Sequence, residues 1–190
     1  MKVLAFNGSP RRGGNTETLL SAVAKGVELA GGEIEIIRLA DLTISPCLSC
    51  GGCDKTGICV LKDDMGELYE KIGRARRIIL ASPIYFYGVT AHAKAFVDRA
   101  QALWSKKNLL KKKGQWCEDP DRLGFFVSVA ATKGEKIFDG AVLTAKYFYD
   151  ALGVSYGGAF LVKGVDKRGE MEKAEEKIRE AEEFGRRITG

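Results

Sequence analysis

The feature that most constrains the fold is an alternation of short apolar runs with amphipathic segments. Apolar runs typical of buried parallel strands cover residues 2–6, 34–39, 77–82, 123–129 and 154–162. Segments with the apolar spacing of a helix cover 17–30, 64–72, 91–104, 138–152 and 171–188. This alternation predicts an α/β fold, a doubly wound five-stranded parallel sheet with helices on both faces. We expect a single domain over residues 1–190.

Two connections are longer than ordinary turns between strands and helices, at residues 40–63 and 105–121. The first holds a cysteine motif. The second is a basic insertion with five lysines and three acidic residues, so its net charge is 5 − 3 = +2. It is either a solvated loop or a docking patch for an acidic electron carrier or a nucleotide phosphate.

A glycine-rich loop between the first strand and the first helix has the features of a phosphate site. The backbone N–H groups at the start of a helix favour negative charge, and glycines let a ligand come close. The loop lacks the G-x-x-x-x-G-K-[ST] and G-x-G-x-x-G patterns, which disfavours a triphosphate loop and a dinucleotide fingerprint. The side chains that can donate to a phosphate monoester are Ser9, Arg11 or Arg12, Asn15, Thr16 and Thr18.

A second loop follows the third strand and can hold a flat ring. Pro83 ends the strand, and Gly88 allows a turn. Between them, aromatic side chains offer flat faces and hydroxyl groups, although any one of them could instead belong to the core or an interface. The residues of this loop are Pro83, Ile84, Tyr85, Phe86, Tyr87 and Gly88.

Together, the segments 7–16 and 82–99 resemble the two motifs of the flavodoxin-like NAD(P)H-dependent FMN reductases. The resemblance covers nearly the whole chain. It implies a flavodoxin-like fold that binds FMN, with residues 83–88 in contact with the flavin ring. It also implies that the loop after the fourth strand closes over the other side of the ring, where Thr132 and Gly134 suit the contact.

Four of the five cysteines follow the spacing C-x2-C-x2-C-x5-C, as Cys47, Cys50, Cys53 and Cys59. Four thiolates are the ligand set of a [4Fe–4S] cluster. A structural zinc site more often uses two separated C-x2-C pairs. Free thiols or adventitious disulfides are the third interpretation. The residues leave these three alternatives open.

The cysteine spacing resembles the compact motif of the iron–sulfur flavoproteins, a branch of the same family found chiefly in archaea. This resemblance implies that the four cysteines bind a [4Fe–4S] cluster. It further implies a homodimer or a homotetramer, with FMN at a subunit interface and the cluster of one subunit near the flavin of another.

Composition points to a cytoplasmic protein that binds neither nucleic acid nor membranes. The net charge of +5 is mixed, from 30 basic and 25 acidic residues, and no apolar run could span a bilayer. The first residues run directly into a Gly/Pro turn, unlike a signal peptide. Cys117 is expected to be a buried or incidental thiol, and His92 a surface or capping residue.

These features favour an oxidoreductase whose chemistry resides in its cofactors, because no catalytic acid or base is evident. The leading hypothesis is an iron–sulfur flavoprotein that transfers electrons between a ferredoxin-like carrier and a small oxidant through a [4Fe–4S] cluster and FMN. The first alternative is a cluster-free FMN or quinone reductase that takes hydride from NAD(P)H. The second is an FMN-binding regulatory protein without turnover.

Overall fold

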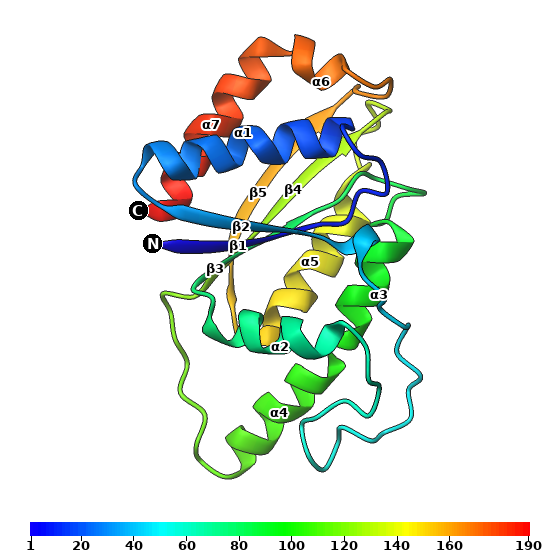
Figure 1. Ribbon diagram of the computed structural model, residues 1–190, viewed down its shortest axis with the longest axis vertical. Helices are drawn as coiled ribbons and strands as arrows, with labels where there is room; N and C mark the ends of the chain where they lie inside the picture. Colours follow the sequence, from blue (N-terminus) through cyan, green and yellow to red (C-terminus); the bar gives the residue numbers. More distant parts are fainter.

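The computed structural model describes all residues 1–190 and contains one sheet. Neighbouring strands are parallel in the order β2-β1-β3-β4-β5 (Figure 1). This order is that of flavodoxin-like doubly wound sheets, which confirms the predicted fold. The strands are β1 (Lys2–Asn7), β2 (Glu33–Arg38), β3 (Arg77–Ala81), β4 (Leu123–Ala130) and β5 (Ser155–Lys163).

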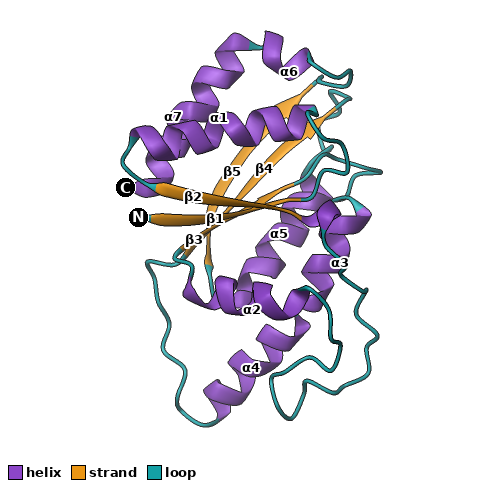
Figure 2. Ribbon diagram, in the orientation of Figure 1, coloured by secondary structure: helices purple, strands orange, loops and turns teal.

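Helices cover both faces of the sheet (Figure 2). One face carries α1 (Asn15–Leu29), α6 (Glu170–Lys173) and α7 (Glu175–Thr189). The other carries a short 3-10 turn, η1 (Leu39–Asp41), with α2 (Met65–Arg74), α3 (Ala91–Arg99) and α5 (Asp139–Leu152). The remaining helix, α4 (Gln101–Lys112), extends α3 away from the sheet.

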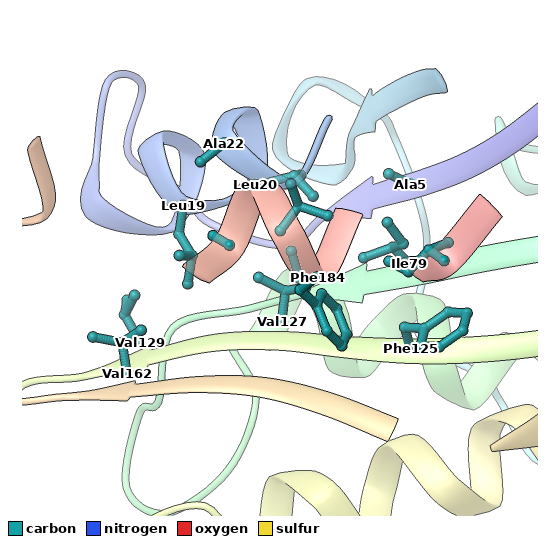
Figure 3. Close-up of a cluster of buried hydrophobic side chains, with 14 of the residues drawn as sticks. Ala5, Leu19, Leu20, Ala22, Ile79, Phe125, Val127, Val129, Val162 and Phe184 are labelled. Atoms are coloured by element: carbon teal, nitrogen blue, oxygen red, sulfur yellow. The ribbon is translucent and has the colours of Figure 1, made fainter. Parts of the chain in front are cut away.

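The core between α1, α7 and the sheet is built from strand side chains that alternate in direction. Ala5, Ile79 and Val127 face this layer, where the rings of Phe125 and Phe184 meet edge to face at 5.8 Å (Figure 3). The central strand β3 is buried along its whole length, which explains why it reads as an almost continuous apolar run, whereas the edge strands β2 and β5 are partly exposed.

The segment predicted as one helix over 91–104 is two helices separated at Ala100. The second continues to Lys112, so about half of the expected basic insertion at 105–121 is helical rather than a loop. The physical reason is that α4 is packed against the rest of the molecule, because Ala102, Ser105 and Lys107 are buried. Lys107 Nζ lies 3.2 Å from Asp150 Oδ2 of α5, so a lysine that suggested a solvated loop instead anchors a helix.

None of the helices combines the length and the apolar character needed to cross a membrane.

Candidate functional site

The glycine-rich loop over residues 8–16, called the phosphate loop below, lies beyond the carboxyl end of β1 and is held by α3. Thr90 caps α3, accepting a hydrogen bond from the Ala93 N–H at 3.2 Å. The same hydroxyl donates to the Gly8 carbonyl at 2.6 Å. A side chain at Gly8 would collide with α3, because its Cβ would lie 2.7 Å from Ala93 Cβ. The loop is therefore locked against the helix that follows β3.

Three of the four arginines near this loop already have partners. Arg168 donates to the Gly13 carbonyl at 3.1 Å. Arg12 donates to Asp41 at 2.8 Å. Arg38 donates to the carbonyls of Ser9 and Pro10, both at 3.2 Å, and so holds the loop from outside. The Arg11 side chain is exposed and makes no hydrogen bond or ion pair within the chain. Arg11 is thus the guanidinium that remains available to an anion. The sequence did not indicate the role of Arg38.

The two motifs that the sequence singled out meet in one pocket of about 90 Å³. Ligand pockets for whole small molecules are usually about 300–1,000 Å³, so this pocket suits a group the size of a phosphate. Its walls come from the phosphate loop, the β3–α3 loop, the end of β4 and the β5–α6 loop. Its lining includes Ser9, Arg11, Asn15, Thr16, Pro83, Ile84, Tyr85, Ala131, Val165 and Asp166.

Asn15 lines this pocket, but its side chain is engaged elsewhere. Its Nδ2 donates to the carbonyls of Asp166 and Lys167 at 3.3 and 2.9 Å, and its Oδ1 accepts from the Met171 N–H at 3.2 Å. The side chain thus holds the β5–α6 loop as a wall of the pocket, which the sequence did not reveal. Thr18 does not line the pocket. The first backbone N–H groups of α1 have no intrahelical acceptor and remain available to an anion.

The aromatic loop is a tight turn in which Tyr85 and Gly88 exchange backbone hydrogen bonds at 2.9 and 3.0 Å. Phe86 and Tyr87 adopt positive φ angles of 49° and 63°, which is uncommon for bulky residues and indicates local strain. The Phe86 side chain is fully exposed. Strained, exposed aromatic residues beside a pocket are typical of a ligand-binding edge. Only Tyr85 of the three lines the pocket itself.

Thr132 and Gly134 lie in the exposed β4–α5 loop and do not line the phosphate-sized pocket. A Cβ at Gly134 would be 3.7 Å from the Tyr87 hydroxyl. This part of the β4–α5 loop is therefore next to the aromatic turn. The expected contact with a flavin ring stays a prediction for residues 83–88, Thr132 and Gly134.

All four cysteines of the motif line a second pocket, of about 490 Å³. Cys47 and Cys50 are exposed, whereas Cys53 and Cys59 are partly buried. As placed, no three cysteine, histidine or acidic side chains form a group that could hold a metal ion. Cys117 is exposed and lies outside this pocket. The fold thus gathers the four predicted thiols around one space without closing them into a ligand sphere.

A buried ion pair joins the two ends of the cysteine-bearing loop. Arg99 donates to both carboxylate oxygens of Asp63, at 2.6 and 3.0 Å, and to the Ser45 carbonyl at 2.8 Å. Asp63 also accepts from the backbone N–H of Ser45 and of Met65. Asp63 therefore bonds to the start of α2, whereas Asp64 accepts from the Thr43 N–H. The hydrogen bond from Arg99 holds the pKa of Asp63 below its usual value.

Arg99 also faces the cysteines. Its side chain lines the cysteine pocket, and its Nε is buried without a hydrogen-bond partner. A buried donor with no acceptor is costly, so the pocket fits an occupant that carries negative charge. Four thiols and an unpartnered cationic donor are a suitable environment for an iron–sulfur cluster held by thiolates.

The helix α3 connects the two pockets. Thr90, at its start, bonds to the phosphate loop, and Arg99, at its end, lines the cysteine pocket. Nine helical residues span about 13 Å. The cysteine loop lies alongside the α3–α4 end of the molecule, away from α1 and α7 (Figure 1).

The sheet order and its helices define a flavodoxin-like protein, with a phosphate-sized pocket at the carboxyl ends of its strands. Residues 1–137 match the NADPH-dependent FMN reductase family, and the chain belongs to this family. The expected family is therefore confirmed.

The chain is similar to proteins named iron–sulfur flavoproteins. One from Methanocaldococcus jannaschii is 42% identical over 103 residues, which cover 54% of this chain and 53% of the relative. A second from the same organism is 28% identical over 192 residues, covering 94% and 90%. The chain spans little more than half the length of three such iron–sulfur flavoproteins that it matches, between 52% and 59%.

Among solved structures, an NAD(P)H:quinone oxidoreductase from Methanothermobacter marburgensis superposes with a TM-score of 0.69. The match covers 100% of this chain and 96% of that chain, at 19% sequence identity. This likeness supports the flavodoxin-like fold.

Proposed function

We propose that this protein is an iron–sulfur flavoprotein, a flavin-dependent oxidoreductase that binds FMN and a [4Fe–4S] cluster. The observation that carries the proposal is that all four motif cysteines line one pocket. Thiolates of this number and kind are the ligand set of such a cluster. The names of the similar proteins support the same conclusion.

In this proposal the chain's own residues bind and orient the cofactors. Arg11 and the N-terminus of α1 bind the FMN phosphate at the pocket where the two motifs meet. The turn from Tyr85 to Gly88 and the loop with Thr132 and Gly134 enclose the flavin ring. When bound, the cluster supplies one-electron transfer and FMN supplies two-electron storage.

The proposed electron donor is an acidic, ferredoxin-like carrier, and the acceptor is a small oxidant. Lys106, Lys111, Lys112 and Lys113 are exposed on or just after α4. Lys106 also packs against Gly57 of the cysteine loop, so this positive surface lies next to the cysteine pocket. Such an arrangement attracts an acidic protein to the side where an electron would enter. We further propose a homodimer or homotetramer.

The test is purification without oxygen, followed by a visible spectrum and assays of iron and acid-labile sulfide. We expect flavin bands over a broad absorbance, with about four irons per chain. Cys59→Ala should lose the iron and retain FMN, because the two pockets use separate residues. Cys117→Ala is the matched control and should retain both. Flavin bands without iron, in protein kept anaerobic throughout purification, would reject the proposal.

The second candidate is a cluster-free FMN reductase that takes hydride from NAD(P)H. The observations that favour it are the family itself and the absence of a closed group of metal ligands. Stopped-flow mixing with NADPH tests it through bleaching of the flavin absorbance. Fast bleaching in iron-free protein would support this candidate, and no bleaching by NADPH or NADH would reject it.

A further inference from the structure

Ser105 lies near the middle of α4 with its hydroxyl directed at the cysteine loop. The residue is only 3% exposed, and its Oγ is 3.6 Å from Cys53 Sγ and 3.4 Å from Asp54 Oδ1. A hydroxyl inside a helix often bonds to the carbonyl four residues earlier, as Thr144 does to Gly140 at 2.9 Å. The Ser105 hydroxyl bonds to the loop instead.

Direct packing keeps Ser105 at this distance from the loop. Gly57 has a φ of 69°, and a Cβ there would lie 2.7 Å from Lys106 Cβ and 2.9 Å from Lys106 Cα. The loop backbone thus rests on the helix one residue beyond Ser105. The position of the hydroxyl relative to Cys53 is set by a rigid helix.

Two acceptors compete for the single hydroxyl proton of Ser105. The Asp54 carboxylate belongs to an exposed residue and can be hydrated, whereas Cys53 is partly buried. A cysteine that ligates a metal is a thiolate, which accepts hydrogen bonds and cannot donate them. Once Cys53 is a ligand, its sulfur becomes the stronger acceptor for this proton.

We propose that Ser105 is a positioning residue that sets the reduction potential of the iron–sulfur site through its hydrogen bond to Cys53; this inference rests on the proposed function. Hydrogen bonds to ligand sulfurs stabilise the more negative, reduced state and raise the potential. Ser105 therefore makes the site easier to reduce by an incoming one-electron carrier.

The experiment is a redox titration, followed by electron paramagnetic resonance, of anaerobically purified wild type, Ser105→Ala and Ser105→Thr. Ser21→Ala is the control, because Ser21 is an exposed serine on α1, on the opposite face of the sheet. We expect the iron–sulfur site of Ser105→Ala to be about tenfold harder to reduce. For a one-electron couple this corresponds to a reduction potential lower by about 59 mV. Ser105→Thr keeps the hydroxyl and should match the wild type, as should Ser21→Ala.

Each other outcome has a definite meaning. An unchanged potential in Ser105→Ala, or equal shifts in Ser105→Ala and Ser105→Thr, overturns the inference while the iron–sulfur site stands. If Ser105→Ala loses its iron while Ser105→Thr keeps iron at the wild-type potential, the inference is overturned. The hydroxyl then has a purely structural role and does not tune the potential. Wild-type protein without iron and sulfide rejects the proposed function together with the inference.

Discussion

At the scale of single residues, buried polar groups determine how the loops of this molecule are held. Arg99 is 1% and Asp63 6% exposed at their side chains, and together they close the cysteine loop. Removing one partner of such a pair leaves an uncompensated buried charge, which typically costs about 3–5 kcal/mol. We expect this loss of unfolding free energy for Asp63→Asn in urea denaturation. Asp98→Asn, in an exposed pair with Lys94, is the control and should change little.

The same pair predicts how stability depends on pH. The pKa of Asp63 is lower in the folded than in the unfolded chain, because Arg99 donates to the charged carboxylate. This contribution is therefore present above the unfolded pKa, about 3.9, and is lost as the pH falls through the folded value. We expect wild type to lose more stability than Asp63→Asn between about pH 5 and pH 2. Parallel stability curves for the two proteins would contradict this.

Thr90 is the residue that joins α3 to the phosphate loop. Thr90→Ala loses the helix cap and leaves the Gly8 carbonyl without its partner, for a cost of about 1–3 kcal/mol. We also expect weaker FMN binding, measured by quenching of flavin fluorescence, because the loop is no longer locked. Thr90→Ser keeps the hydroxyl and should bind FMN like the wild type; equal weakening in both variants would argue against the locking role.

At the scale of secondary-structure elements, α1 and α7 approach so closely that only glycine fits between them. A Cβ at Gly185 would lie 2.0 Å from the Val23 carbonyl oxygen, and one at Gly26 would lie 1.9 Å from that of Glu182. Gly185→Ala should therefore destabilise the protein by about 1–3 kcal/mol or more, measured by thermal or urea unfolding.

Gly73 in α2 is the matched control for this substitution, because a Cβ there meets nothing within 4 Å. Gly73→Ala should stabilise the protein by up to about 1 kcal/mol, since alanine loses less backbone entropy in a helix. If the two substitutions changed the stability by the same amount, helix propensity rather than packing would determine the effect at both positions.

At the scale of the whole molecule, charge is placed at the end that carries the cysteine pocket. Reversing the exposed pair Lys112 and Lys113 to glutamate should slow reduction by an acidic one-electron carrier at least about tenfold at low salt. The difference should shrink at high salt, where exposed charges are screened. Lys173→Glu is the control, because α6 lies at the opposite end of the molecule. If the variant with glutamate at both positions is reduced as fast as the wild type, this surface is not the docking site.

The sequence by itself determined the sheet, the phosphate loop, the aromatic turn and the cysteine motif. Each of these is a local pattern: strand and helix periodicity, glycines before a helix, or the spacing of one residue type. The match of residues 1–137 to the FMN reductase family confirms the family that these patterns predicted. Such patterns are visible because the physical requirement acts between neighbours in the chain.

Only the tertiary structure decided which partners these residues have. It assigned Arg12 to Asp41 and left Arg11 available, and it directed the Asn15 side chain to the β5–α6 loop. It turned part of a predicted basic insertion into α4 and so brought Ser105 to Cys53, 52 positions away. Such contacts depend on how packed helices bring distant segments together, and no local spacing encodes them.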